Sequence, residues 1–301
     1  MNRPSAAARG RLPRPRKRFG QHFLVDRQAL AAIADLARPA AGEAVLEVGP
    51  GRGALTRVLL ERLDRLVAVE IDRDLVAHLG RELADPGLHL IEGDVLALDL
   101  RGLLAREGAT RLVVVGNLPY NITAPVIFRM IEHEDIVGRA IFTLQREVAQ
   151  RLVAQPGSRQ YGLITVMLRL HAQARICASI DRSAFRPVPR VDSSVVEITF
   201  GAGGVAVGDR ALFDQVARLA FQQRRKMLRN ALKGLPALAD AGTEALEARS
   251  GVDLSRRAET LSLEEFAALT EAAAEIAQGA ATAPAGGAGE AAAPEPGEIE
   301  A

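Results

Sequence analysis

Cysteine is almost absent from this chain of 301 residues, in which Cys177 is the only one. A single cysteine excludes an intrachain disulfide. Cys177 lies in the apolar run 176–178, so we expect a small buried side chain and not a reactive thiol. This cysteine usage is typical of a reducing compartment, and we therefore expect a cytoplasmic protein.

Long hydrophobic runs are also missing. No apolar segment reaches the roughly 20 residues that a membrane-spanning helix needs. The basic N-terminal residues are not followed by the hydrophobic region of a signal peptide. No internal repeat is found, and the length allows one sizeable core with a smaller second domain. We therefore expect no contact with a membrane.

An excess of charge of one sign is missing as well, because the formal net charge is only +1. The charge is nevertheless uneven: residues 9–18 are intensely basic, and a second basic cluster spans 224–226. From about residue 278 the chain consists mainly of Ala, Gly, Pro and Glu, which bury too little surface to fold. The predicted organisation is a basic arm at 1–18, an α/β domain at 19–203, a small helical domain at 204–277 and a disordered tail at 278–301.

Short apolar strands alternate with amphipathic helices in the first half of the chain. Strands are expected at 44–48, 66–69, 88–91, 112–116 and 140–144, and helices at 26–36, 55–63, 75–83 and 126–131. Segment 112–116 is continuously apolar, which predicts a strand buried on both faces of a parallel sheet. Two more helices (147–154 and 163–170) and two β-like runs (174–180 and 195–200) precede an Ala- and Leu-rich helical region. The pattern predicts a Rossmann-like, doubly wound α/β sheet.

A glycine-rich loop, residues 47–53 (EVGPGRG), follows the first predicted strand of the alternation. Glycines there let the backbone turn tightly and approach a ligand, although a plain strand-to-helix turn explains them equally well. Glu70 ends the next strand, where a carboxylate can accept both ribose hydroxyls of a nucleoside. Asp94 follows the third strand and is placed to accept from an adenine amino group. A dinucleotide-binding enzyme would share this pattern, and Ala54 fits its spacing too.

The tetrapeptide Asn117, Leu118, Pro119 and Tyr120 decides between these nucleosides. It ends the predicted buried strand, at the edge where α/β sheets bind ligands. The Asn117 amide oxygen and the Leu118 carbonyl can accept both hydrogens of an aromatic amine, which directs its lone pair at a methyl donor. Pro119 fixes the bend, and Tyr120 offers a stacking face. We infer transfer of a methyl group from S-adenosylmethionine without a metal; the plainer alternative is that Asn117 caps the next helix.

Four segments of the chain resemble the ribosomal RNA adenine N6,N6-dimethyltransferases. These segments are residues 17–24 (KRFGQHFL), 47–53 (EVGPGRG), 116–122 (GNLPYNI) and 185–193 (FRPVPRVDS). The resemblance covers residues 16 to about 269. Residues 221–230 (FQQRRKMLRN) are similar to the bacterial KsgA-type members, which dimethylate two adjacent adenosines in a hairpin near the 3′ end of small-subunit (16S) rRNA.

The resemblance implies roles for individual residues. The methyl donor would be bound by His22, Leu24, Gly49, Gly51, Glu70, Ile71, Asp94, Val95 and Asn117. Tyr120 and Phe185 would sandwich the target base. His22 departs from the asparagine often found at its position in the family, and either side chain can form a hydrogen bond.

Basic residues are the candidates for RNA contact. They are Arg16, Lys17, Arg18, Arg218, Arg224, Arg225, Lys226 and Arg229. Arg218, Gln222, Arg225 and Arg229 would share one face of a helix, opposite the apolar residues Val216, Leu219 and Met227. The expected partner is small-subunit rRNA in a pre-ribosomal particle, bound by a monomer. Alternatives are a methyltransferase of large-subunit rRNA, a DNA adenine methyltransferase, or an assembly factor in which docking matters more than catalysis.

Overall fold

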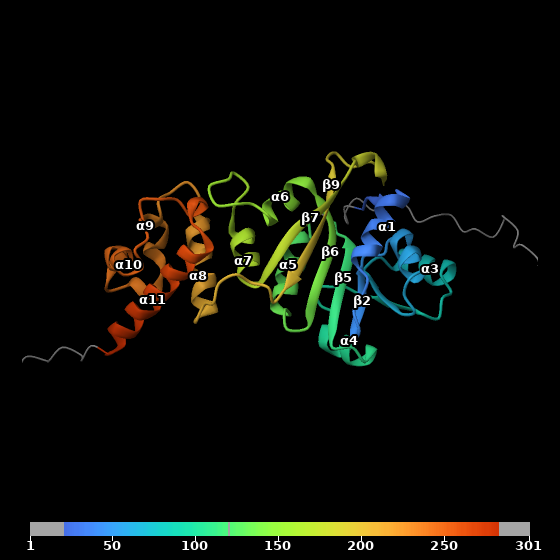
Figure 1. Ribbon diagram of the computed structural model, residues 1–301, viewed down its shortest axis with the longest axis horizontal. Helices are drawn as coiled ribbons and strands as arrows, with labels where there is room; N and C mark the ends of the chain where they lie inside the picture. The colour runs from blue at the N-terminus through green and yellow to red at the C-terminus, as the bar shows by residue number, and fades with distance from the viewer. Residues whose placement is uncertain (1–20, 120, 283–301) are drawn as a thin grey trace, which may run out of the picture.

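The computed structural model describes residues 21–119 and 121–282, and its centre is a seven-stranded sheet with the order β4-β3-β2-β5-β6-β9-β7 (Figure 1). The strands are β2 (Glu43–Val48), β3 (Leu66–Glu70), β4 (Leu88–Glu92), β5 (Arg111–Asn117), β6 (Val137–Gln145), β7 (Ala172–Ile180) and β9 (Ser193–Phe200). Neighbours from β4 to β6 are parallel, whereas β9 runs antiparallel to both β6 and β7. The predicted doubly wound α/β sheet is confirmed.

Both faces of this sheet are buried under helices. The helices along the sheet are α1 (Arg27–Leu36), α2 (Ala54–Leu60), α3 (Arg73–Glu82), α4 (Leu100–Glu107), α5 (Thr123–Glu132), α6 (Arg146–Leu152) and α7 (Leu163–His171). Val113 and Val115 of β5 pack in the cluster with α1 and α2, whereas Leu112 and Val114 pack in the cluster with α4 to α7. All four are at most 1% exposed, so the prediction of a strand buried on both faces is confirmed.

Helix α4 was not predicted from the sequence. It is short and only moderately amphipathic, and it is bounded by Asp99, whose side chain accepts from Gly102 N, and by Gly108 in a left-handed conformation. The N-cap prediction at Asp26 is confirmed, because the Asp26 carboxylate accepts from Ala29 N at 2.8 Å.

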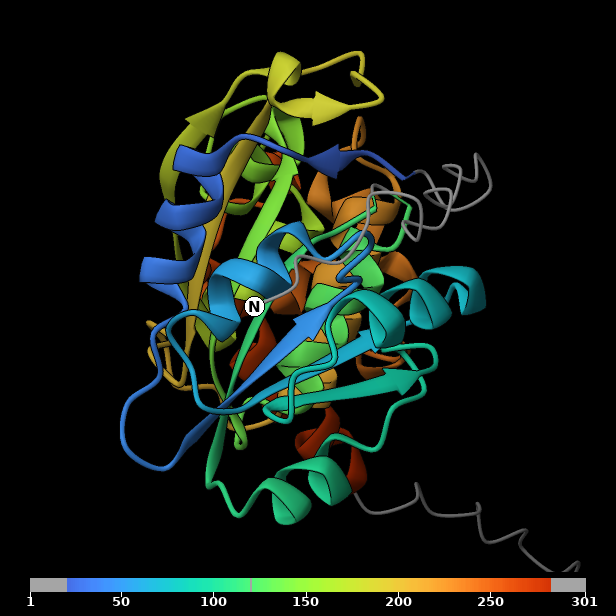
Figure 2. The same cartoon turned by 90° about the vertical axis from the view of Figure 1, so that its right-hand side faces the viewer.

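A small two-stranded ribbon is separate from the seven-stranded sheet. Strand β1 (Phe23–Leu24) pairs antiparallel with β8 (Phe185–Arg186), and Leu24 lies opposite Phe185. Figure 2 shows β1, in blue, beside the yellow segment that contains β8. Strands of two residues carry no periodicity, so the sequence predicted only a proline-rich loop around residues 185–189.

The C-terminal part is helical and lies at one end of the sheet (Figure 1). It consists of α8 (Arg210–Gln222), α9 (Leu228–Ala231), α10 (Gly242–Ser250), α11 (Leu263–Thr282) and short 3-10 turns. Its hydrophobic core also contains Tyr161, Val166 and Met167 from around α7. Residues that precede the predicted domain boundary at 203/204 therefore contribute to the core of the helical part. Helix α11 continues through residues 278–282, where disorder was predicted, because Ala-rich sequence favours a helix even without much to bury.

The expectation that the Cys177 side chain is buried needs correction. Cys177 is only partly buried, because it lies at the irregularity between Ile176 and Ala178 in the edge strand β7. Burial is still sufficient to raise the pKa of the Cys177 thiol, which disfavours the reactive thiolate. Within residues 21–119 and 121–282, no helix is long and apolar enough to cross a membrane.

Candidate active site

A cavity of about 330 Å³ opens at the carboxyl ends of β2, β3 and β5 and beside the loop after β4. This is where the strand order reverses, since β2 lies between β3 and β5. Its volume falls in the range of small-molecule sites. The predicted site residues that line it are His22, Gly49, Gly51, Glu70, Ile71, Asp94, Val95, Asn117, Leu118, Pro119 and Phe185.

One predicted residue, Leu24, is placed differently. The Leu24 side chain is 5% exposed, packs in the core with α1, and lines a smaller neighbouring cavity of about 40 Å³. It therefore does not bring its side chain into the large cavity. Tyr120 lies outside the described residues.

The glycine loop is held in place by backbone bonds to a buried carboxylate. Gly49 and Gly51 have φ values of +66° and +61°, which non-glycine residues rarely adopt. The Glu70 carboxylate accepts from Gly51 N and from Asp72 N, each at 3.0 Å. Burial raises the pKa of Glu70 above its ordinary value, and the N–H donors of Gly51 and Asp72 offset only part of that rise. The loop and the end of β3 thus form one rigid wall of the cavity.

Phe23 lines the cavity but was not among the predicted site residues. Its ring lines both cavities and lies so close to the loop that a Cβ at Gly51 would come within 2.9 Å of it. The guanidinium carbon of Arg52 lies 4.6 Å from the ring centre. The sequence did offer one indication of its importance, because Phe23 lies in the segment 17–24 between His22 and Leu24, two predicted site residues.

Asn117 ends β5 with its amide in a defined orientation. Its Nδ2 donates to the His22 carbonyl at 2.7 Å, which leaves Oδ1 as the acceptor. The alternative role as a helix cap is wrong, because α5 begins at Thr123 with Ile122 at its N-cap. The following turn is fixed by Pro119, whose carbonyl accepts from Ile122 N at 3.2 Å.

Phe185 reaches the cavity through the β1–β8 ribbon. It is 1% exposed and lines the large cavity. Besides the pairing with Leu24, a bond from Val25 N to the Ala184 carbonyl (2.8 Å) and one from His22 Nδ1 to the Pro187 carbonyl (2.8 Å) fix the ribbon. The ribbon thus joins an aromatic ring to the edge of the sheet that holds the glycine loop.

A sequence model described as ribosomal RNA adenine dimethylase matches residues 13–275. The chain belongs to the ribosomal RNA adenine dimethylase family. It is 46% identical to ribosomal RNA small subunit methyltransferase A of Geobacter metallireducens, covering 88% of this chain and 97% of that one. It is 47% identical to the protein of the same name from Anaeromyxobacter sp. strain K, covering 85% and 92%.

Solved structures resemble this dimethylase as well. The 23S rRNA methyltransferase ErmE is 26% identical with a TM-score of 0.64, covering 84% of this chain and 99% of that one. A dimethyladenosine transferase from Plasmodium falciparum shares the fold, with a TM-score of 0.67 at 23% identity, and covers 82% and 95%. The chain is therefore a methyltransferase of ribosomal RNA adenine that uses S-adenosylmethionine, as the sequence predicted.

The basic residues of the dimethylase do not form the predicted stripe. Helix α8 ends at Gln222, so Arg225 and Arg229 do not continue its face. Met227, expected on the apolar side, is 48% exposed. Arg218 and Gln222 both lie on α8. Residues 223–227 form a turn into α9, so the basic cluster follows the helix instead of continuing it.

Within that turn, neighbouring arginines have different environments. Arg224 donates to the carbonyls of Arg159 (2.6 Å) and Tyr161 (2.9 Å) and pairs with Glu259 (3.1 Å). Arg225 and Lys226 are exposed and form no ion pair with any residue the structure describes. Arg218 pairs with Asp214 and Arg229 with Glu247. Arg16, Lys17 and Arg18 lie outside the described residues.

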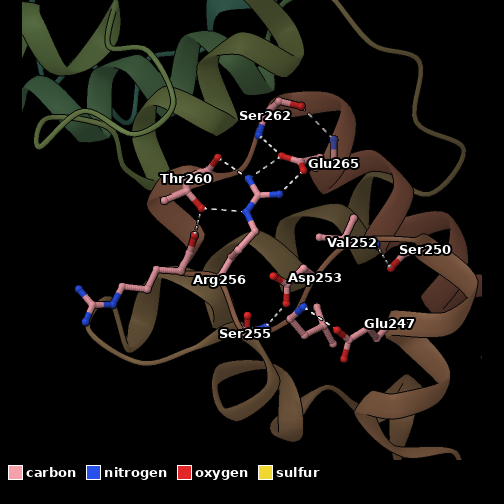
Figure 3. Close-up of polar contacts among 11 residues, drawn as sticks. Glu247, Ser250, Val252, Asp253, Ser255, Arg256, Thr260, Ser262 and Glu265 are labelled. Carbon is pink, nitrogen blue, oxygen red and sulfur yellow. Dashed lines mark hydrogen bonds and ion pairs between the residues drawn. The ribbon is translucent and has the colours of Figure 1, made fainter.

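The turn is anchored at its other end by the segment between α10 and α11. The carbonyls of Arg256 and Leu254 accept from Leu228 N (2.9 Å) and Arg229 N (3.0 Å). Figure 3 shows how Arg256 is itself held, with its guanidinium bonded to both Glu265 oxygens and to Thr260. Arg225 and Lys226 are therefore presented by a turn that is fixed at both ends.

Proposed function

We propose that this chain dimethylates the N6 amino groups of two adjacent adenosines in a hairpin near the 3′ end of small-subunit (16S) rRNA. The observation that carries the chemistry is the Asn117 amide at the cavity edge, with its donor end bonded and its acceptor end available. The choice of small-subunit rRNA rests on relatives at 46–47% identity whose names state that substrate. The enzyme acts as a monomer on a pre-ribosomal small subunit in the cytoplasm, where ribosomes are assembled.

The cavity fits the methyl donor. Gly49 has open space where a side chain would stand, and Gly93 does too, so a flat nucleoside can approach the backbone closely. Glu70 would accept from the ribose hydroxyls with its remaining lone pairs, and Asp94 would accept from the adenine amino group. Ile71 is 50% exposed at the cavity, which is the exposure expected of an apolar side chain that covers an adenine face.

The bound donor supplies an electrophilic methyl group on a sulfonium. On the other side of the cavity, Asn117 Oδ1 and the Leu118 carbonyl accept the two N6 hydrogens of the target adenine. As the N6 lone pair forms the new C–N bond, the bond between the methyl carbon and the sulfonium sulfur would break and leave its electron pair on sulfur, so that a neutral thioether departs. The two acceptors would stabilise the positive charge that develops on nitrogen. The excess proton then leaves to water, because the methylated ammonium of an aromatic amine is acidic. Phe185, and Tyr120 outside the described residues, would stack on the base.

Basic residues would contact the phosphate backbone. Arg225 and Lys226 are presented by the anchored turn, and the basic arm that contains Lys17 and Arg18 precedes β1. Neutralised phosphates release counterions, so binding should weaken steeply with salt.

One experiment tests both the chemistry and the substrate. The full chain is incubated with methyl-labelled S-adenosylmethionine and purified immature small subunits, large subunits or duplex DNA, and the modified nucleotide is mapped. We expect N6,N6-dimethyladenosine at two neighbouring positions of small-subunit rRNA. Label confined to the large subunit would overturn the proposal and favour methylation of 23S rRNA, the substrate named for ErmE.

A further inference from the structure

His22 contacts both elements that the proposed function assigns to the target base. Its backbone carbonyl accepts from Asn117 Nδ2 at 2.7 Å. Its imidazole Nδ1 donates to the Pro187 carbonyl at 2.8 Å. Pro187 directly follows β8, which contains Phe185. A single residue therefore stands between the amide that aligns the base and the strand that carries the stacking ring.

The His22 carbonyl determines which end of the amide is available. The two ends of an amide have nearly the same shape but opposite hydrogen-bonding roles. A carbonyl oxygen at 2.7 Å accepts from Nδ2 and repels Oδ1, so it excludes the flipped amide. Oδ1 of Asn117 is thereby kept as the acceptor that an amino group of the target requires.

The imidazole determines where that carbonyl lies. Strand β1 contributes only two residues to the ribbon, Phe23 opposite Arg186 and Leu24 opposite Phe185. The His22 ring adds a side-chain bond to Pro187 one position beyond this pairing. The Pro187 carbonyl oxygen can only accept, so Nδ1 carries the hydrogen in this contact.

We propose that His22 is a positioning residue for methyl transfer, whose imidazole fixes the end of β1 and whose carbonyl then holds the Asn117 amide with Oδ1 as acceptor. The inference rests on the proposed function for the role of Asn117. It differs from a donor-binding role of His22, because a donor contact changes donor affinity whereas a positioning contact changes the rate of the bound complex.

The test compares His22→Ala and His22→Asn with His89→Ala as a matched control. His89 also forms an imidazole bond, to Glu107, but it lies near the start of β4, away from the cavity. For His22→Ala we expect kcat at saturating S-adenosylmethionine to fall about tenfold or more, with the donor Kd from calorimetry changed by less than about twofold. His22→Asn should restore most of the rate, because Asn Nδ2 places a donor where His Nδ1 stands. His89→Ala should behave like the wild type.

A second measurement needs neither donor nor RNA. The side-chain amide protons of Asn117, followed by NMR in the donor-free protein, should shift and exchange faster in His22→Ala and remain near wild type in His22→Asn. Unchanged amide signals, or a raised donor Kd with unchanged kcat at saturation, would overturn the inference. If the wild type does not methylate small subunits, the proposed function fails on its own, and the amide signals still decide the role of His22.

Discussion

The cavity edge of the sheet and the basic turn of the helical part would serve one reaction, but they are built in different ways. At the cavity, polar side chains are tied to backbone atoms: Glu70 to Gly51 N, and Asn117 to the His22 carbonyl. At the basic turn, the backbone is anchored while Arg225 and Lys226 extend into solvent. This difference fits the proposed roles, because methyl transfer requires fixed acceptors, whereas attraction to phosphates acts at longer range and tolerates mobile cations.

The largest expected effect is at the fixed acceptor. Asn117→Ala removes Oδ1 from the cavity, and we expect kcat to fall about 10²–10³-fold, as for other groups that stabilise developing charge. RNA binding should remain near normal, because the basic turn is untouched. Single-turnover assays and filter binding measure the two quantities, with Gln28→Ala on the exposed side of α1 as a control. A variant that transferred methyl groups at the wild-type rate would refute the acceptor role.

The second prediction concerns the buried carboxyl group of Glu47, which should make the stability of the protein depend on pH. Glu47 is 1% exposed, and burial, with a smaller contribution from Glu70, raises its pKa to about 8. Its proton is held more tightly in the folded than in the unfolded chain, so stability falls as pH rises from the unfolded pKa to about 8, by at most about 1.4 kcal/mol per pH unit.

Glu47→Gln keeps the shape of the side chain without an ionisable group. We therefore expect the free energy of unfolding, measured by denaturant titration, to decline less between pH 5 and pH 8 in the variant than in the wild type. Parallel curves for the two proteins would show that Glu47 does not titrate in this window.

A third change tests how tightly the glycine loop and Phe23 are packed. Gly51→Ala places a Cβ 2.9 Å from the Phe23 ring at a φ of +61°, so we expect a loss of about 1–2 kcal/mol in stability and weaker donor binding. Gly108→Ala is the matched control, with a φ of +63° and no atom within 4 Å of the added Cβ. Equal donor affinity in both variants would mean that the contact with Phe23 does not shape the site.

The smallest effects should separate the two adjacent arginines. Arg225→Ala should weaken rRNA binding and lower the slope of log affinity against log salt by about 1, because one phosphate contact is lost. Arg224→Ala should leave that slope nearly unchanged and reduce stability by about 1 kcal/mol, since Arg224 bonds Glu259 and two backbone carbonyls. Affinity measured over a salt series and thermal unfolding check the pair. If Arg224→Ala lowered the slope of log affinity against log salt by a full unit, Arg224 would be a phosphate contact instead.

Much of the candidate site was predictable, because each parallel strand delivers its final residues to one edge. Glu70, Asp94 and Asn117 each stand at or just after the end of a predicted strand, so their convergence follows from the alternation of strands and helices. Phe23 was missed, because a two-residue strand gives no sequence period. The basic stripe was wrong, because spacing at helical intervals does not reveal that α8 ends at Gln222.

The sequence by itself determined the sheet, the glycine loop, the Asn117 tetrapeptide and the family, because local patterns and short motifs specify these. Only the tertiary structure decided the orientation of the Asn117 amide and the distinct environments of Arg224 and Arg225. Those features depend on the His22 carbonyl, 95 positions from Asn117, and on the Arg159 carbonyl, 65 positions from Arg224. Contacts between residues so distant in the chain arise from packing, which no local pattern encodes.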